Sequence, residues 1–271
     1  MNCKIVVITI DDPIYTARYI GSIVEKFKNH IVAATVLSPL REPNLTPYSD
    51  GRPLRVIKQR LEYYGLKSFL KFCFLYGALK ALDVFYKIGL IKRPFSVSSI
   101  LDKYTIRKLQ CPQNDLNNLE YIEKIKEFEP DIILCNFSQV VSKRFLDIAK
   151  IGCLNTHYSL LPENRGREPL FWTLLNGETA GVTIYKMTEN IDTGDIIAQK
   201  SFSLNGIKTL HGAIKYSYEI SKTLVVDALE KIIYDKKISV KRIEGKSAST
   251  YNKWPQQEHI ALFRKKGFEF I

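Results

Sequence analysis

The sequence is short of acidic residues and of paired cysteines, and each shortage narrows the classes of protein it can belong to. Its 271 residues contain 28 Asp and Glu against 40 Lys and Arg, a formal net charge of +12 at pH 7. Such an excess favours an anionic partner: a nucleic acid, a phosphorylated small molecule or a membrane surface. The five cysteines are far apart and include no Cys-x-x-Cys pair. We therefore expect inert thiols in a reducing cytosol, and neither a zinc site nor a redox couple.

Long apolar runs, a signal peptide and a dinucleotide-binding loop are also missing. In the most apolar region the longest charge-free stretch is the eight residues from Phe72 to Leu79, whereas about 20 are needed to cross a bilayer. The N-terminus enters a strand-like run without the charged n-region or the small-residue cleavage site of a secretory signal peptide, so export by a signal peptide is not expected. No Gly-x-Gly-x-x-Gly follows this run, which argues against a dinucleotide cofactor. A cytoplasmic protein is expected.

Short β-branched runs alternate with helical patterns through the first two thirds of the chain. Residues 4–10, 31–37 and 131–137 are apolar runs typical of strands buried on both faces of a parallel sheet. Residues 16–27 are expected to form a helix with Pro13 in its first turn. The pattern predicts an α/β protein with a Rossmann-like, open, mainly parallel twisted sheet and helices on both faces, followed by a small C-terminal helix and a hairpin-like tail.

Two domains are expected, a large α/β domain over residues 1–204 and a small C-terminal helix and tail over 205–271. A basic, aromatic insertion over residues 51–110 interrupts the first domain and holds 13 basic and 3 acidic residues. Its helical-wheel pattern predicts two amphipathic helices separated at Gly77. Such helices either lie on an anionic membrane, with residues 61–91 in contact at the inner face, or pack on their own domain.

The densest group of chemically capable side chains follows a further strand-like run, CLNTH. Asn155 and His157 are two positions apart, so their side chains leave the strand on the same face. An amide beside an imidazole suits a reaction that passes through an oxyanion, because Asn donates to developing negative charge and His moves a proton. Asp192 and Asp195 lie downstream in the turn IDTGDI, where either carboxylate is a candidate to orient His157. Taken singly, each feature is common in purely structural positions.

In combination, these motifs resemble the folate-dependent formyltransferases, which include methionyl-tRNA, glycinamide ribonucleotide and amino-sugar N-formyltransferases. The resemblance is carried by Asn155-x-His157, by Ser-Leu-Leu-Pro and Arg-Gly within 159–166, by Gly-Val-Thr at 181–183, and by Ile-Asp-Thr-Gly-Asp at 191–195. It implies transfer of a formyl group from N10-formyltetrahydrofolate to a primary amine. It implies no metal, and the sequence offers no cluster of metal ligands.

The resemblance also assigns roles to individual residues. The family's catalytic constellation falls on Asn155, His157 and Asp192: the first two would stabilise the oxyanion, while Asp192 would orient His157 and help to move the proton. Backbone groups of two loops would hold the folate, and these align with Phe137, Ser138, Gln139, Val140 and Val141, and with Thr188, Glu189, Asn190 and Ile191. Acceptor contacts are expected from Ser159, Arg165, Gly166 and Arg167.

The acceptor amine stays open among several classes. The ending around residues 251–255 looks like that of amino-sugar enzymes, which favours a phosphate-bearing, nucleotide-linked or lipid-linked amino sugar of surface polysaccharide biosynthesis. Methionyl-tRNA is the alternative: a basic tail would suit RNA, but the 67 residues after 204 are too few for the C-terminal domain of those enzymes. Nucleic acid is thus the less expected partner. A homodimer is expected from the family, and a catalytically idle homologue that binds a membrane or a partner is the remaining interpretation.

Overall fold

Parallel pairing of β-branched strands builds the N-terminal part of the fold in this computed structural model, which describes residues 3–39, 53–236, 240–242 and 251–271. β1 (Ile5–Ile10) lies between β2 (Ile31–Leu37) and β4 (Ile132–Asn136) and pairs parallel with both. Nearly every residue of β1 and β4 is buried, as expected for Ile- and Val-rich strands of a sheet covered on both faces. The buried side chains of these strands therefore form the hydrophobic core of this region.

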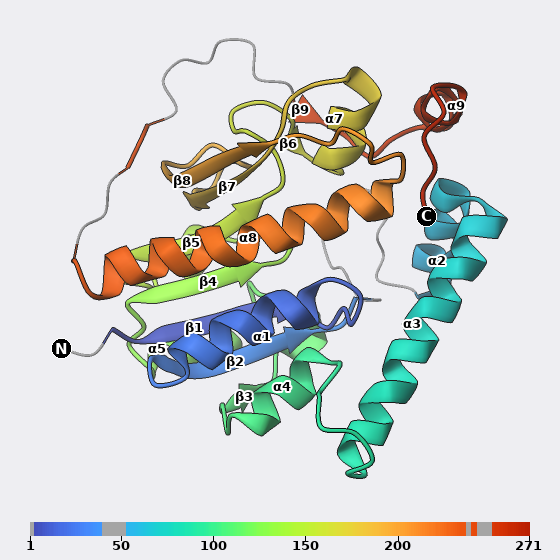
Figure 1. Cartoon of the computed structure of the whole chain (residues 1–271). Helices are drawn as coiled ribbons and strands as arrows, with labels where there is room; N and C mark the ends of the chain where they lie inside the picture. The colour runs from blue at the N-terminus through green and yellow to red at the C-terminus, as the bar shows by residue number, and fades with distance from the viewer. Residues whose placement is uncertain (1–2, 40–52, 237–239, 243–250) are drawn as a thin grey trace. The chain divides into compact units, whose positions relative to one another are not determined.

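Seven strands form one mainly parallel sheet in the order β3-β2-β1-β4-β5-β7-β8 (Figure 1). β3 (Lys108–Leu109) pairs with β2, β5 (Gly152–His157) pairs parallel with β4, and β7 (Ala180–Lys186) pairs antiparallel with β8 (Ile196–Phe202). The chain runs outward from β1 to β3 and returns to β4 on the other side of β1. Such a switch point is where open α/β sheets bind ligands, beyond the carboxyl ends of the strands. The predicted α/β class is confirmed.

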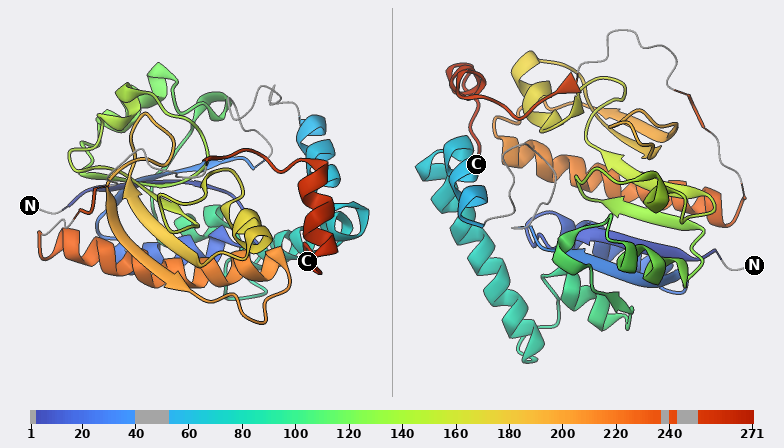
Figure 2. Two further views of the ribbon diagram at one scale, coloured as in Figure 1. Left: turned by 90° about the horizontal axis from the view of Figure 1, so that it is seen from above. Right: turned by 180° about the vertical axis from the view of Figure 1, so that it is seen from behind.

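Helices cover both faces of the N-terminal strands. α1 (Thr16–Phe27) and α4 (Val97–Lys103) lie on one face and α5 (Leu119–Lys126) on the other (Figure 2). The chain also forms a short 3-10 turn, η1 (Pro112–Asn114), and a single helical turn, α6 (Lys143–Leu146). The expected span of α1 is confirmed, but the expected place of Pro13 in its first turn is wrong. Asp12 accepts from the amide of Ile14 at 2.7 Å, which closes a turn before the helix begins.

The described residues divide into two compact units, one made of Met1–Lys58 and Phe72–Asn155 and the other of Gln59–Lys71 and Thr156–Ile271. The second unit contains α7 (Pro169–Asn176), α8 (Leu210–Ile233) and α9 (Gln257–Lys265). In that unit α8 packs against β7, β8 and α7. The expected domain division at residue 204 stays a prediction.

Aromatic side chains fill much of the core of the second unit. The ring centroid of the buried Tyr63 lies 4.9 Å from those of Trp254 and Phe270 and 5.8 Å from that of Phe171. Phe171 in turn stacks on Phe263 at 4.7 Å. The cluster joins the C-terminal segment to α7 and to the end of α2 (Pro53–Tyr64).

The C-terminal tail pairs with a distant loop. β9 (Tyr251–Asn252) forms a two-stranded parallel pair with β6 (Arg165–Gly166). A Cβ atom at Gly166 would lie 2.3 Å from the carbonyl oxygen of Asn252, and its φ is +93°, so only glycine permits this approach. Where the sequence predicted a hairpin-like tail, the described residues form the short strand β9 and the helix α9. Residues 243–250, which belong to the predicted tail, lie outside the described residues.

The insertion expected over 51–110 contains two long helices, but the predicted break at Gly77 is wrong. α2 is followed by α3 (Leu66–Lys87), and the break is at Gly65, whose φ of +72° ends the first helix. Gly77 lies inside α3, where a glycine costs only about 1 kcal/mol relative to alanine. Residues 51 and 52 of the insertion lie outside the described residues. Among the helices that the structure describes, none has the length and apolar character required to cross a bilayer.

Candidate active site

The end of β5 and the turn between β7 and β8 bring an imidazole and a carboxylate together. His157 Nδ1 lies 3.6 Å from Asp192 Oδ2, and both side chains are buried. On the other side of the ring, Nε2 is 2.8 Å from the backbone oxygen of Asn164. A carbonyl oxygen can only accept, so Nε2 carries the hydrogen. In the neutral ring, Nδ1 therefore presents its lone pair on the side of the carboxylate.

Two donors and a tight turn fix the Asp192 carboxylate. Tyr185 donates its hydroxyl to Oδ1 and Gly166 donates its amide to Oδ2, each at 2.7 Å. The φ of Asp192 is +53°, a left-handed conformation that few non-glycine residues adopt and that is often found at functional sites. A Cβ at Gly194 would lie 1.6 Å from the backbone oxygen of Lys186. The glycine of the Asp-x-Gly motif is thus required for the turn to close against β7.

Asn155 lies on β5 two residues before His157, so the two side chains share a face of the strand. It is 9% exposed and stands opposite Cys135 of β4 in the parallel register. Its amide can donate to an oxygen that develops negative charge. Strand geometry therefore places the two residues side by side as the sequence predicted, while the chemical role of each stays a prediction.

The Ser-Leu-Leu-Pro loop after β5 is held by two polar side chains of the β7–β8 pair. Thr183 donates its hydroxyl to the backbone oxygen of Ser159 at 2.7 Å and accepts from the amide of Leu161 at 3.1 Å. Gln199 donates to the oxygen of Leu161 at 3.0 Å. Ser159 itself is 2% exposed, and its hydroxyl donates to the backbone oxygen of Glu163 at 2.6 Å. In this structure its side chain stabilises the loop; the expected acceptor contact stays a prediction.

Asn164 is a central residue of this site that sequence reasoning did not identify. Besides holding His157 through its backbone oxygen, it accepts from Asn252 Nδ2 at 2.6 Å and donates to the hydroxyl of Thr173 at 3.3 Å. Its amide also donates to the carboxylate of Glu178. Asn252 is 88 positions away in sequence, so no local pattern could have indicated this network. Tyr185 was missed for a related reason, because only the turn brings it to Asp192.

The first loop expected to bind folate follows β4 in the N-terminal unit. Its side chains alternate between buried Phe137, Gln139 and Val141 and exposed Ser138 and Val140. The Gln139 amide donates to the backbone oxygen of residue 114 at 2.7 Å and accepts from the amide of residue 116 at 3.3 Å. The loop is thereby fixed at the carboxyl end of a parallel strand, beside the switch point of the sheet.

The second loop expected to bind folate is an exposed turn in the C-terminal unit. Thr188, Glu189, Asn190 and Ile191 are all exposed. The turn is tied together by the Thr188 and Thr193 hydroxyls, which donate to the backbone oxygen of Asn190 at 3.1 and 3.2 Å. It leads directly into Asp192, so a ligand bound to this turn lies next to the carboxylate.

Two arginine side chains lie over the ring of one tryptophan, and a third arginine has a buried donor. The guanidinium carbons of Arg167 and Arg60 lie 5.3 and 5.9 Å from the centre of the Trp254 ring. Arg165 Nε is buried, and the described residues supply no acceptor for it. Gly166, which lies between Arg165 and Arg167 in the sequence, donates its amide to Asp192, so these two arginines belong to the loop that holds the carboxylate.

Glu168 completes this part of the second unit. It accepts from the Tyr63 hydroxyl at 3.1 Å. Burial, and then the neighbouring Glu168 charge, raise the pKa of Tyr63 well above its usual value, so the phenol keeps its proton. Across the described ranges, no three His, Cys, Asp or Glu side chains are grouped so that they could hold a metal ion.

The chain is similar to known formyltransferases in sequence and in fold. A family model described as formyl transferase matches residues 96–214. A methionyl-tRNA formyltransferase of Borrelia recurrentis is 30% identical over 82% of this chain and 68% of that protein. The phosphoribosylglycinamide formyltransferase of Bacillus halodurans aligns with a TM-score of 0.57 at 17% identity, covering 86% of this chain and 97% of that one. A sugar 3N-formyltransferase, solved with dTDP and 5-N-formyl-THF, aligns at 0.55 and 15% identity over 93% and 70%.

Proposed function

Because this chain belongs to the formyltransferase family, we propose that it transfers a formyl group from N10-formyltetrahydrofolate to the primary amine of a phosphate-bearing amino sugar. The observation that carries the transfer chemistry is the buried pair of His157 and Asp192. His157 lies on β5, the strand that also carries Asn155. Formyl transfer needs a proton acceptor and a donor to a developing oxyanion. This group of three provides both.

The proton chemistry follows from the tautomer of His157. Because Nε2 donates to the backbone oxygen of Asn164, Nδ1 is the atom that can take a proton from an attacking amine. The resulting imidazolium would lie against the Asp192 carboxylate, which is itself fixed by Tyr185 and Gly166. Asn155 would donate its amide to the oxygen that gains negative charge. General acid–base catalysis of this kind contributes about 10²- to 10⁴-fold to a rate.

Each of the two predicted folate loops, taken by itself, suits a co-substrate that is held by the backbone groups of the loop. Each is an ordered loop fixed by its own side chains, with exposed positions at Ser138 and Val140 in one and at 188–191 in the other. When bound, N10-formyltetrahydrofolate would supply the formyl group. The sugar 3N-formyltransferase of similar fold was solved with 5-N-formyl-THF, a formylated folate, and this supports the choice of co-substrate.

The acceptor part of the proposal rests on the arginines that flank Gly166 in the sequence, since the amide of Gly166 holds Asp192. Arg165 has a buried donor for which the described residues supply no acceptor, and Arg167 and Arg60 lie against Trp254. Arginine binds phosphate with paired, charge-assisted hydrogen bonds. We therefore assign the phosphate of a nucleotide-linked or lipid-linked amino sugar to Arg165 and Arg167, in a cytoplasmic step of surface polysaccharide synthesis. The fold shared with a sugar 3N-formyltransferase is consistent with this acceptor.

Methionyl-tRNA is a second candidate acceptor, because a relative at 30% identity is a methionyl-tRNA formyltransferase. The same arginines would then meet the RNA backbone. The distinguishing experiment incubates the protein with N10-formyltetrahydrofolate and either a panel of amino-sugar nucleotides or charged tRNA, and detects the formylated product by mass spectrometry. Product from tRNA alone would overturn the sugar assignment and leave the transfer chemistry standing.

The catalytic assignment is tested with His157→Gln, which retains a side-chain donor for the oxygen of Asn164. We expect kcat to fall about 10²-fold or more. The matched control is His211→Gln, on α8 and outside the candidate site. Circular dichroism should show both variants folded. A His157→Gln enzyme with half of the wild-type kcat would exclude His157 as the proton acceptor.

A further inference from the structure

A long helix of the insertion exposes an apolar stripe that the formyl-transfer site does not explain. The stripe consists of Leu66, Leu70, Phe74, Val84, Phe85 and Ile88, at spacings that keep them on one side of α3 and its last turn. Phe74 is 80% exposed, Leu66 64% and Ile88 63%. Of the 17 large hydrophobic residues exposed in the described chain, nine lie between residues 54 and 90. Exposed apolar side chains concentrated in this way mark an interaction surface.

Small residues fill the middle of the same face. Cys73, Gly77 and Ala81 are exposed, and a Cβ added at Gly77 would meet no atom within 4 Å. None of these carries charge, so the apolar stripe runs uninterrupted from the first turn of the helix to the last.

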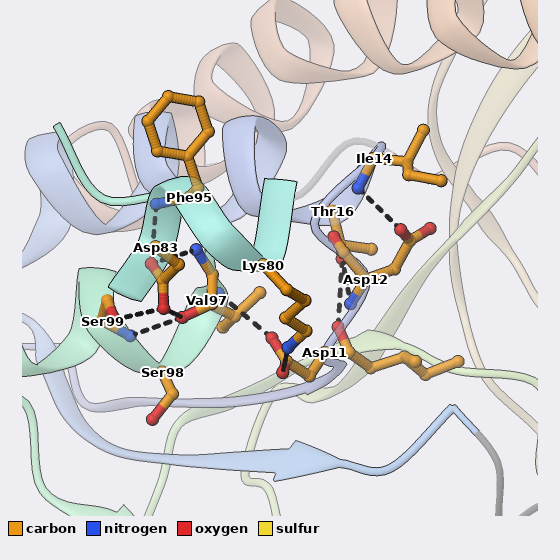
Figure 3. A network of polar contacts seen from close by, with 12 residues as sticks. Asp11, Asp12, Ile14, Thr16, Lys80, Asp83, Phe95, Val97, Ser98 and Ser99 are labelled. Atoms are coloured by element: carbon orange, nitrogen blue, oxygen red, sulfur yellow. Dashed lines mark hydrogen bonds and ion pairs between the residues drawn. The ribbon is translucent and has the colours of Figure 1, made fainter. Parts of the chain in front are cut away.

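The part of α3 that belongs to the N-terminal unit is tied to that unit by two charged side chains, and the buried one, Asp83, lies on the side of the helix away from the stripe. Figure 3 shows Lys80, whose Nζ is 2.6 Å from Asp11 Oδ2. It also shows Asp83, which accepts from the amide of Ser96 at 2.8 Å and from the hydroxyl of Ser99 at 2.8 Å. Asp83 is 3% exposed. Turning α3 to bury the stripe would break these contacts and leave a buried carboxylate without donors, which is costly.

The charges around the stripe have one sign. Lys67 and Lys71 are exposed on one flank in the first half of the helix, and Lys87, Lys92 and Arg93 are exposed at its end. Over residues 53–93 the acidic side chains are Asp83, which is buried, and a single exposed glutamate at position 62. A second copy of the helix would set lysines against lysines, whereas an anionic surface would complement them.

We propose that α3 docks the protein on an anionic lipid surface, with the stripe in the boundary between headgroups and acyl chains and the flanking basic residues among the phosphates. Leu and Phe on one face with Lys beside them is the composition of helices that lie in this interface. Each lysine near an anionic bilayer strengthens binding about five-fold. The docking surface is independent of the formyl acceptor, so it stands or falls separately from the proposed reaction.

The first test is flotation of the full-length protein with vesicles of phosphatidylglycerol or of phosphatidylcholine. The wild type should float with the anionic vesicles and not with the neutral ones. Leu70→Gln combined with Phe74→Gln should weaken binding by about ten-fold or more. Leu119→Gln is the matched control, because Leu70 and Leu119 are both 57% exposed and Leu119 lies on α5. A wild-type protein that stays in the aqueous fraction would overturn the proposal.

The charge component is tested with Lys67→Gln combined with Lys71→Gln, against Lys231→Gln on α8 as the control. The double variant should bind anionic vesicles about 25-fold more weakly, five-fold for each lysine, and the control should bind as the wild type does. Equal losses in the control would mean that net charge and not α3 determines binding, which would contradict the proposal.

The depth of the stripe is tested with a polarity-sensitive fluorophore on Cys73. This is the exposed cysteine of the five, while burial raises the pKa of Cys3 to about 11 and of Cys111 to about 12, so labelling below those values favours Cys73. The emission should shift to the blue with phosphatidylglycerol vesicles. Light scattering tests whether the stripe instead binds a second copy of the chain. If the wild type is a dimer and the Leu70 and Phe74 substitutions convert it to a monomer, the stripe is a dimer interface and the lipid assignment is overturned.

Discussion

The hydroxyl of Tyr185 offers a sharp test of how the candidate site is built. It donates to Asp192 Oδ1 at 2.7 Å and is one of the two donors that fix this carboxylate. Tyr185→Phe removes one oxygen atom from a side chain that is 2% exposed and leaves the ring in place. Hydrogen bonds to charged groups contribute about 1.5–3 kcal/mol, so we expect the free energy of unfolding to fall by about that amount.

The structure supplies a matched control in Tyr121→Phe. The Tyr121 hydroxyl donates to the hydroxyl of Thr35, also at 2.7 Å, and Tyr121 is wholly buried. Its partner is neutral and belongs to the N-terminal sheet, so the loss should be about 1 kcal/mol. Formyl transfer should be unchanged in this variant. The two substitutions thus delete the same atom from buried rings and differ in whether the partner is Asp192.

Catalysis should separate the two variants more clearly than stability does. Without the Tyr185 hydroxyl, the Gly166 amide is the one donor that the described residues still give the Asp192 carboxylate, so the carboxylate can move relative to His157. Small misplacements of catalytic groups cost up to about a hundred-fold in rate. We expect a fall in kcat of about ten-fold or more with KM little changed, because Tyr185 acts through Asp192 and not on substrate. Steady-state kinetics and urea unfolding on both variants measure this. If Tyr185→Phe lost stability but kept the wild-type kcat, the positioning role of Tyr185 would be refuted.

Two further substitutions test the local geometry. Gly166→Ala should lower the free energy of unfolding by about 2 kcal/mol or more and reduce kcat, because its Cβ would lie 2.3 Å from the oxygen of Asn252. Gly177→Ala is the control, because Gly177 also has a positive φ, +70°, but a Cβ there would meet no atom within 4 Å. This control should lower the free energy of unfolding by only about 1 kcal/mol and keep its activity. Desolvation raises the pKa of Asp83, but the hydrogen bonds from the Phe95 amide and from the start of α4 outweigh it, so the pKa lies below its usual value. The ionised Asp83 carboxylate therefore stabilises the folded state above about pH 4, and this stabilisation is lost as the pH falls through the lower pKa of the folded state. Urea midpoints against pH should show this acid-side loss in the wild type and a weaker one in Asp83→Asn.

Elements and residues whose placement depends on their own neighbours in the sequence could be predicted. The β-branched runs indicated β1, β2 and β4 because buried parallel strands need apolar side chains on both faces. Alternation along β5 was enough to place Asn155 and His157 on one face. The formyltransferase resemblance selected Asp192 from the two carboxylates of its turn, and the structure brings that residue to 3.6 Å from His157.

The rest of the site could not be predicted because it depends on contacts between distant segments. Asn164 gains its place from Asn252, 88 positions away, through strands of only two residues, too short to give a periodic signal. The break between α2 and α3 was misplaced for a different reason. Gly65 and Gly77 look alike in sequence, and only the positive φ of Gly65, set by how the chain must turn, distinguishes a helix end from a glycine inside a helix.

Burial of one acidic residue changes what the charge of the insertion means. Residues 51–110 hold 13 basic and 3 acidic residues, and a count treats every charge as equally visible to a partner. Asp83 is 3% exposed and is satisfied by the start of α4, so little of its field reaches solvent beside the stripe. The same hydrogen bonds orient α3 with its apolar side outward. The contact that hides the acid therefore also exposes the stripe, and both effects make this face of α3 more apolar and more positive than its composition indicates.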